Sequence, residues 1–194
     1  MNSEQYYNEN ANDFISTTIN VDLSELYEKF LKYVPKNSHV LDAGCGSGRD
    51  SKYFLDNGFK VSAIDASIEM VKSAKVLTGL DVKQIYFQDI KEINTYDAIW
   101  SCASLLHVAK DNIEIVFKKF ITALKNDGIW YMSFKYGREE RIKDNRLFND
   151  YTEESIKELI AKFDELEILE TWFTEDKRPD RSDKWINVIV KKIF

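Results

Sequence analysis

Three alternate glycines that follow an apolar, strand-like segment constrain this 194-residue chain more than any other feature. Residues 39–50 read HVLDAGCGSGRD and contain Gly44, Gly46 and Gly48. Glycine accepts positive φ angles and lets another group approach the backbone, because it has no Cβ. A turn of this kind between a strand and a helix can surround a ligand and offer it the free N–H groups of the helix. Dinucleotide-binding domains use a similar turn, so the glycines alone do not decide the function.

Length and composition indicate one domain with a substantial core, because no linker rich in Pro, Gly or Ser interrupts the chain. The net charge of −6 argues against broad binding to nucleic acid, which needs a positive surface. The N-terminal residues contain no apolar signal region, and no segment is apolar for long enough to span a membrane. We therefore expect a cytoplasmic protein, monomeric or homodimeric, without a membrane partner.

Two cysteines, Cys45 and Cys102, are present. Their spacing matches neither a metal site nor a disulfide framework, so we predict no metal ion. In a reducing cytosol we expect both to be free thiols.

Strand-like and helix-like segments alternate through most of the chain, which predicts a parallel sheet with right-handed crossovers. Strands are expected at 40–41, 60–65, 82–87, 96–102 and 129–134, and helices at 49–57, 67–77, 111–124 and 152–163. The rhythm changes at the end of the chain, where the strand-like segments 166–173 and 185–190 enclose only a short polar stretch. That stretch cannot form a packed crossover helix, so these two strands should be antiparallel.

The N-terminal part begins with polar residues and scattered aromatic side chains, including Tyr6, Tyr7 and Phe14. An amphipathic helix follows and ends before Pro35. Two interpretations stay open for residues 1–34: the segment packs against the edge of the sheet, or it folds over a ligand as a lid.

Five parallel strands, a glycine turn after the first and an antiparallel end resemble class I S-adenosylmethionine-dependent methyltransferases. The run LDAGCGSG at residues 41–48 is similar to the first motif of that family. The resemblance implies an α/β, Rossmann-like, doubly wound sheet of seven strands, mostly parallel with an antiparallel C-terminal strand, plus an N-terminal helical lid. It also implies one domain over residues 1–194, with a donor-binding core at 38–134 and a substrate-side insertion, a helix and a terminal hairpin at 135–194.

The resemblance assigns S-adenosyl-L-methionine as the cofactor and places its site at the carboxyl ends of the strands. Asp65 matches the acid that holds the ribose hydroxyls, and Asp89 matches the acid beside the adenine. The expected donor-binding residues are Asp42, Gly44, Cys45, Gly46, Gly48, Asp65, Ala66, Gln88, Asp89, Ile90 and Ser101. Structural roles stay open: Asp65 could cap the next helix, Asp89 could be a turn residue, and Asp42 could support the loop.

Two other functions compete with methyl transfer. An NAD(P)-dependent oxidoreductase would need a third glycine at position 49, which is Arg49. A non-catalytic scaffold could keep the same fold, although its nucleotide motif would be free to degrade. Within the methyltransferases, the run from 41 to 65 resembles tellurite-resistance and related small-molecule enzymes.

His107 is the one side chain near the end of strand 96–102 whose pKa is naturally close to neutral. It is a candidate base for the acceptor's proton, or it simply packs beside the next helix. The loop after residue 134 and the terminal hairpin are rich in arginine. Because guanidinium groups bind oxyanions with two hydrogen bonds, we expect a small, anionic acceptor. The predicted acceptor-binding residues are Tyr7, Tyr136, Arg141, Arg178 and Arg181.

Overall fold

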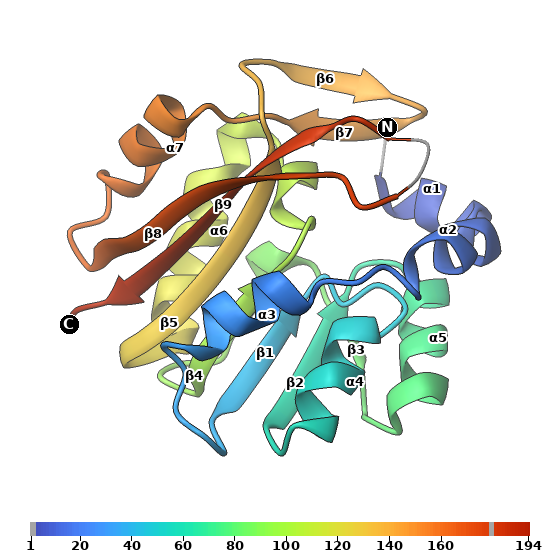
Figure 1. Cartoon of the computed structure of the whole chain (residues 1–194), viewed down its shortest axis with the longest axis horizontal. Coiled ribbons are helices and arrows are strands. Elements are labelled where there is room, and N and C mark those ends of the chain that lie inside the picture. The colour runs from blue at the N-terminus through green and yellow to red at the C-terminus, as the bar shows by residue number, and fades with distance from the viewer. Residues whose placement is uncertain (1–2, 179–180) are drawn as a thin grey trace.

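A seven-stranded sheet forms the centre of the molecule, with helices on both faces (Figure 1). This computed structural model describes residues 3–178 and 181–194, and the strand order is β3-β2-β1-β4-β5-β9-β8. The strands are β1 (His39–Ala43), β2 (Lys60–Asp65), β3 (Lys83–Gln84), β4 (Tyr96–Ser101), β5 (Leu124–Lys135), β8 (Leu166–Glu175) and β9 (Lys184–Lys192). β1 to β5 pair in parallel, whereas β9 is antiparallel to both β5 and β8. The predicted mostly parallel sheet with an antiparallel C-terminal strand is confirmed.

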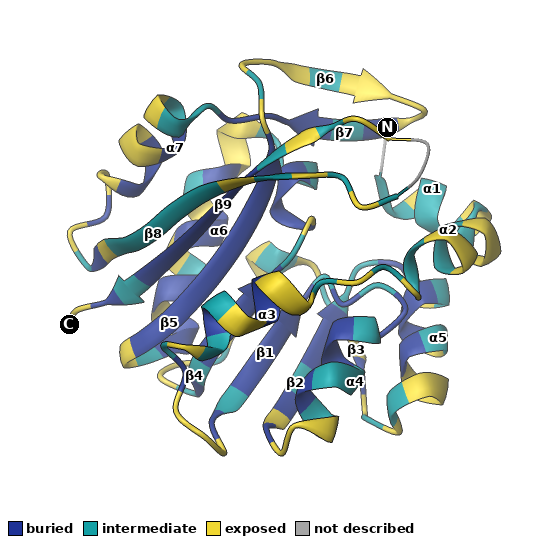
Figure 2. Cartoon of the chain, in the orientation of Figure 1, coloured by how far each residue is buried: buried dark blue, intermediate teal, exposed yellow. Residues whose placement is uncertain are grey.

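Helices cover the two faces of the sheet because side chains alternate between the faces along each strand. On one face lie α3 (Ser24–Leu31), α4 (Arg49–Asp56) and α5 (Ile68–Thr78), and on the other lie α6 (Lys110–Ala123) and α7 (Glu153–Ile160). In β4, Trp100 packs toward α3 and α4 while its neighbour Ile99 packs toward α6. Figure 2 shows the central strands β1, β4, β5 and β9 largely buried, β8 mostly intermediate, and the outer helix surfaces exposed. None of the helices in the described parts of the chain is long and apolar enough to cross a membrane.

Two additions lie at the end of the sheet where the parallel strands finish (Figure 1). One is the helical N-terminal segment, α1 (Ser3–Glu9) and α2 (Ala11–Thr18). The other is a two-stranded hairpin of β6 (Glu140–Lys143) and β7 (Arg146–Asn149). The two additions touch each other, since the Leu147 N–H donates to Oγ of Ser3 at 3.1 Å. Short 3₁₀ turns η1 (Phe87–Asp89) and η2 (Leu105–His107) complete this end of the molecule.

Two local features differ from the sequence prediction. The third strand is only two residues long instead of 82–87, because it is an exposed edge strand that turns at once into η1. The β6–β7 hairpin was not predicted. Its turn consists of Asp144 and Asn145, which have φ angles of 50° and 59°, and these residue types tolerate such angles.

Candidate active site

A cavity of about 510 Å³ lies at the carboxyl ends of the parallel strands. Its lining comes from the glycine turn, the N-terminal helices, the loops after β2, β3 and β4, and the β6–β7 hairpin. This volume is within the range of small-molecule sites, and the position is where open α/β sheets bind ligands.

The glycine turn needs glycine for two physical reasons. Gly44 has a φ of +79°, and a Cβ on it would lie 2.4 Å from Cβ of Ser104. Gly48 has a φ of +90° at the start of α4, and its Cβ would lie 3.0 Å from Ala74 of α5. The turn is thus packed closely against two neighbouring segments, while its backbone stays beside the cavity.

Asp65 joins the end of β2 to this turn. Its Oδ2 accepts a hydrogen bond from the Gly46 N–H at 2.9 Å, and Oδ1 accepts from the Ser67 N–H at 2.8 Å. Burial raises the pKa of Asp65 to about 6, against the effect of these N–H donors. Ser67 itself caps α5, and its hydroxyl donates to Oδ1 of Asn8 in α1 at 2.7 Å. The N-terminal helix α1 is therefore hydrogen-bonded to Ser67, two residues after Asp65.

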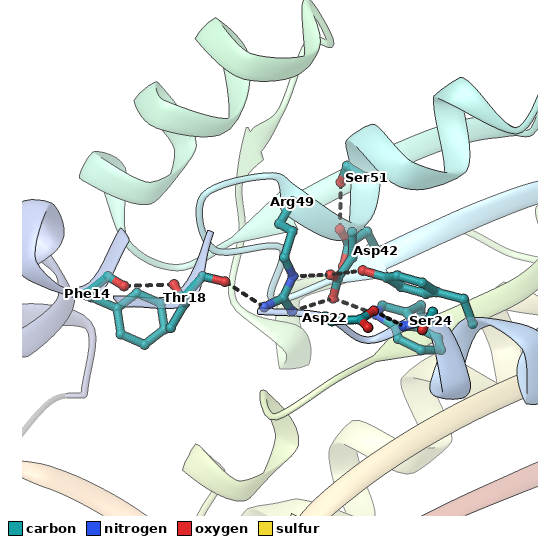
Figure 3. A network of polar contacts seen from close by, with 10 residues as sticks. Phe14, Thr18, Asp22, Ser24, Asp42, Arg49 and Ser51 are labelled. Atoms are coloured by element: carbon teal, nitrogen blue, oxygen red, sulfur yellow. Dashed lines mark hydrogen bonds and ion pairs between the residues drawn. The ribbon is translucent and has the colours of Figure 1, made fainter. Parts of the chain in front are cut away.

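A buried polar network around Arg49 and Asp50 holds the glycine turn in place (Figure 3). Asp50 accepts hydrogen bonds from the Tyr27 hydroxyl at 2.6 Å, from Nε1 of Trp100 at 2.8 Å and from Nε of Arg49 at 2.6 Å. Burial raises the pKa of Asp50, but Arg49 and the two neutral donors outweigh it, so the pKa lies below its ordinary value. The other end of Arg49 donates from Nη1 to the Thr18 carbonyl oxygen at 2.9 Å, which links α2 to the turn.

Asp42 lies beside this network and carries a different charge state. Its Oδ2 accepts a hydrogen bond from the Ser51 hydroxyl at 2.6 Å (Figure 3). Burial and the neighbouring charge of Asp50 raise the pKa of Asp42 to about 8. Burial and the Asp50 charge therefore both favour the protonated, neutral form of Asp42.

The acceptor side of the cavity contains a tyrosine–histidine pair. The Tyr7 hydroxyl lies 2.8 Å from Nε2 of His107, and Nδ1 of His107 lies 2.6 Å from the Leu147 carbonyl oxygen. Burial lowers the pKa of His107 to about 4, so the ring is neutral at physiological pH. The two contacts also mean that both ring nitrogens of His107 have partners within the protein.

The structure brings more than half of the predicted site residues to the cavity. Those that line it are Tyr7, Gly44, Cys45, Gly46, Asp65, Ala66, Gln88, His107, Arg178 and Arg181. Of these, Arg178 is already paired, because its Nε and Nη2 both donate to the carboxylate of Asp176, at 2.8 and 2.5 Å.

The remaining predicted residues lie away from the cavity lining. They are Asp42, Gly48, Asp89, Ile90, Ser101, Tyr136 and Arg141. Several have a clear structural environment instead. Ser101 is buried and accepts from Nε1 of Trp130 at 3.1 Å, and Ile90 belongs to the core. Arg141 pairs with Asp150 at 3.0 Å, and Tyr136 is an exposed ring packed beside Phe173.

Residues outside the predicted set also contribute to the site, among them Lys135 and Arg146, which line the cavity, and Asn8, which bonds to Ser67 beside it. Arg146 and Lys135 are polar residues on strands, at positions whose alternation places them on an inward face. The Asp-Asn turn of the hairpin was a usable signal, since it fixes which residues of β7 face inward. Asn8 had no comparable signal in the sequence.

Comparison with known proteins agrees with this geometry. Residues 40–128 match the family described as methyltransferase domain. An uncharacterized methyltransferase of Staphylococcus carnosus is 28% identical over 153 residues, which cover 71% of this chain and 73% of that protein. A malonyl-[acyl-carrier protein] O-methyltransferase of Enterobacter lignolyticus is 41% identical over 69 residues, which cover 33% of this chain and 26% of that enzyme. Apart from the staphylococcal protein, the curated relatives are matched over less than half of their own length.

The fold also matches solved structures. The Burkholderia thailandensis 1,6-didemethyltoxoflavin-N1-methyltransferase, solved with 1,6-didemethyltoxoflavin and S-adenosylhomocysteine, superposes with a TM-score of 0.79. That match covers 99% of this chain and 88% of that one at 20% sequence identity. At this identity, the likeness establishes a shared class I fold.

Proposed function

We propose that this chain, whose residues 40–128 match the methyltransferase domain family, transfers a methyl group from S-adenosylmethionine to a small-molecule acceptor. One observation carries the proposal: the Asp65 carboxylate at the end of β2 accepts from the Gly46 N–H of the glycine turn at 2.9 Å. An acid held there is positioned to accept charge-assisted hydrogen bonds from the vicinal hydroxyls of a nucleoside.

The residues around the glycine turn fit such a donor. Gly46 leaves its cavity side open, since the nearest atom to an added Cβ would be 3.8 Å away on Phe14. Beyond Asp65, Ile85 and Phe87 provide apolar surface on which an adenine ring can pack. When bound, S-adenosylmethionine supplies a methyl group activated by a positively charged sulfur. The chain contributes orientation and exclusion of water, which can account for much of the acceleration of a methyl transfer.

On the acceptor side, we assign the Tyr7–His107 pair to the acceptor's proton. Since Nε2 of His107 already accepts from Tyr7, the imidazole has no free nitrogen for the acceptor's proton, and the proton would pass through the Tyr7 hydroxyl. His107 then orients Tyr7 and accepts the hydrogen bond of the Tyr7 hydroxyl while that hydroxyl contacts the acceptor. The donor roles of the other predicted residues, the lid role of residues 1–34 and the cytoplasmic location remain predictions.

Two measurements test the proposal. Calorimetry should show binding of S-adenosylmethionine and its product S-adenosylhomocysteine, and much weaker binding of NAD⁺ and NADP⁺. Incubation with methyl-labelled S-adenosylmethionine and fractionated metabolite extract should then transfer label to a small molecule. Tight binding of NAD(P)⁺ would indicate the oxidoreductase, and donor binding without any label transfer would indicate the non-catalytic scaffold.

A further inference from the structure

Arg146 is a buried cation in the cavity that the donor site does not use. It begins β7 opposite Lys143, and only 7% of the residue is exposed. Together with Tyr7, His107 and Lys135, it lines the part of the cavity formed by α1, β5, η2 and the hairpin.

Aromatic rings hold the guanidinium group of Arg146 in place. Its central carbon lies 4.0 Å from the ring centre of Tyr6 in α1 and 5.2 Å from that of Phe148 on the same strand. A planar guanidinium stacks well on such rings, and the stacking leaves its edge free to make hydrogen bonds. The rings also shield the charge from bulk water. Arg146 is thus fixed and dehydrated before any ligand arrives.

The charge of Arg146 is poorly compensated within the described residues. Its ion-pair partner is Asp144, whose carboxylate is 3.6 Å from Nη2 and whose side chain is 59% exposed. The Tyr7 hydroxyl also accepts a hydrogen bond from Arg146, but it is neutral, because burial raises its pKa, so it does not compensate the charge. Nε of Arg146 is buried and has no hydrogen-bond partner among the described residues. Arg49 and Arg178 differ, because each donates from two nitrogens to one carboxylate. A buried charge with so little pairing is costly, which favours the binding of an anion beside it.

The surroundings restrict what that anion can be. Lys135, the other buried cation here, is already neutralised by Asp183, with Nζ 2.6 Å from Oδ2. Arg146 contacts the rings of Tyr6, Tyr7 and Phe148, and apolar side chains such as Leu106 and Trp185 also line the cavity. A planar guanidinium whose Nε has no partner among the described residues, inside a largely apolar pocket, matches one carboxylate on an apolar body.

We infer that Arg146 binds a carboxylate of the methyl acceptor with two hydrogen bonds, so that the acceptor is a largely apolar carboxylic acid. This inference rests on the proposed function, which supplies the donor, and it replaces the predicted Arg141 and Arg178 by Arg146 as the main anion contact. Stacking of Tyr6 on the same guanidinium couples the anion to the position of α1.

Benzoate and benzamide provide a direct test, because they share size and shape but differ in charge. Calorimetric titrations use wild-type protein saturated with S-adenosylhomocysteine, together with the Arg146→Gln, Arg146→Lys and Arg138→Gln variants. Wild type should bind benzoate at least tenfold more tightly than benzamide. Arg146→Gln should lose this preference, Arg146→Lys should keep only part of it, and the exposed Arg138→Gln should behave like wild type. Equal binding of both probes by wild type, or an unchanged preference in Arg146→Gln, would overturn the inference.

Thermal unfolding and a second anion sharpen the test of Arg146. Thermal unfolding checks that Arg146→Gln and Arg146→Lys stay folded at the temperature of the titrations, because loss of the contacts with Tyr6 and Phe148 lowers the melting temperature by itself. Binding of inorganic phosphate instead of benzoate would overturn the carboxylate assignment. The benzoate and benzamide titrations are repeated without S-adenosylhomocysteine, so that they do not depend on donor binding. If the protein does not bind the donor, the proposed function is contradicted, but the titrations without S-adenosylhomocysteine still test Arg146.

Discussion

Tyr7 of α1 donates its phenolic O–H to Nε2 of His107 across 2.8 Å, although the two residues are 100 positions apart in the chain. The opposite nitrogen, Nδ1, lies 2.6 Å from the Leu147 carbonyl oxygen, which can only accept. A neutral imidazole has one donor and one acceptor nitrogen, so these contacts fix the tautomer with hydrogen on Nδ1. His107 therefore joins the N-terminal helix to the β6–β7 hairpin across the acceptor side of the cavity.

The first prediction concerns the hydroxyl of Tyr7. Tyr7→Phe keeps the ring that packs on Phe14 at 4.9 Å between centroids, but it leaves Nε2 of His107 without its donor. We expect a loss of about 1–2 kcal/mol in the free energy of unfolding, measured by urea denaturation. Tyr6→Phe is the matched control, because the contact of Tyr6 with Arg146 needs only its ring. Equal stability of the two variants would contradict a contribution from the Tyr7–His107 bond.

The second prediction concerns the pH dependence that His107 imposes. Burial lowers the pKa of His107 from 6.5 to about 4, so the unfolded chain binds this proton first as the pH falls. The stability that depends on neutral His107 is complete above pH 6.5 and is lost as the pH falls from 6.5 toward 4. Between these limits, wild type should lose on the order of 1–3 kcal/mol more than His107→Asn, which retains a donor toward Leu147. Urea denaturation of both proteins at pH 7, 5.5 and 4.5 measures the difference, and parallel curves would refute it.

The central sheet was predictable from the sequence because its signals are local. The strand β4 is apolar on both faces, and the segment between β8 and β9 is too short for a crossover helix. Both properties can be recognised without knowing where any distant residue lies. The N-terminal helices were expected as a helical segment, yet their residues show no clear apolar period. The reason is that α1 packs polar groups against the site, for example Asn8 against Ser67.

The candidate site was less predictable because it depends on partners that are distant in the sequence. Arg178 and Arg146 look alike in the sequence, but Arg178 is neutralised by Asp176 two residues away, whereas Arg146 is buried beneath Tyr6. Asp42 precedes the glycine turn and suggests a ligand contact, yet its side chain points to Ser51 inside the protein. Contacts between residues that are distant in the sequence decide which acid or arginine is left available for a ligand. These contacts cannot be recognised from the sequence alone.

The third prediction concerns Asp65 and the proposed donor. Asp65→Ala should weaken binding of S-adenosylmethionine by roughly 10- to 150-fold, because a charge-assisted hydrogen bond contributes about 1.5–3 kcal/mol. The wild-type affinity should also fall as the pH drops through about 6, where the Asp65 carboxylate takes up a proton. Calorimetry at several pH values measures both effects, with Asp56→Ala on the exposed face of α4 as the control. Asp65→Ala with wild-type affinity would remove Asp65 from the donor site.

The fourth prediction concerns Asp42, whose pKa burial raises to about 8. The folded protein holds this proton up to a higher pH than the unfolded chain, whose carboxyl group has a pKa near 3.8. The corresponding stability is fully present below pH 3.8 and is lost as the pH rises toward 8. Asp42→Asn stays neutral and still offers an oxygen to the Ser51 hydroxyl. It should therefore be more stable than wild type at pH 8, by roughly 1–3 kcal/mol, with a smaller difference at pH 5. A variant that is less stable than wild type at pH 8 would show that Asp42 is needed in its charged form.

The last prediction concerns the Arg49–Asp50 pair, in which Arg49 takes the place of the third glycine of dinucleotide-binding turns. Arg49→Met leaves the Asp50 carboxylate buried with only the neutral Tyr27 and Trp100 donors. We expect a loss of about 3 kcal/mol in the free energy of unfolding, because removal of one partner strands a buried charge.

A double-mutant cycle separates the pair from its surroundings. In Arg49→Met/Asp50→Asn, the neutral amide oxygen still accepts from Tyr27 or Trp100, so the double variant should lose at least about 1 kcal/mol less than the sum of the single losses. Lys52→Met, which breaks the exposed Lys52–Asp56 pair on the same helix, should change stability little. Because Arg49 also donates to the Thr18 carbonyl oxygen, Arg49→Met should additionally make α1 and α2 more sensitive to limited proteolysis than Asp50→Asn does. Strictly additive losses in the cycle would show that Arg49 is not the counter-ion of Asp50. Unchanged cleavage of the N-terminal segment would show that Arg49 does not hold α2 to the glycine turn.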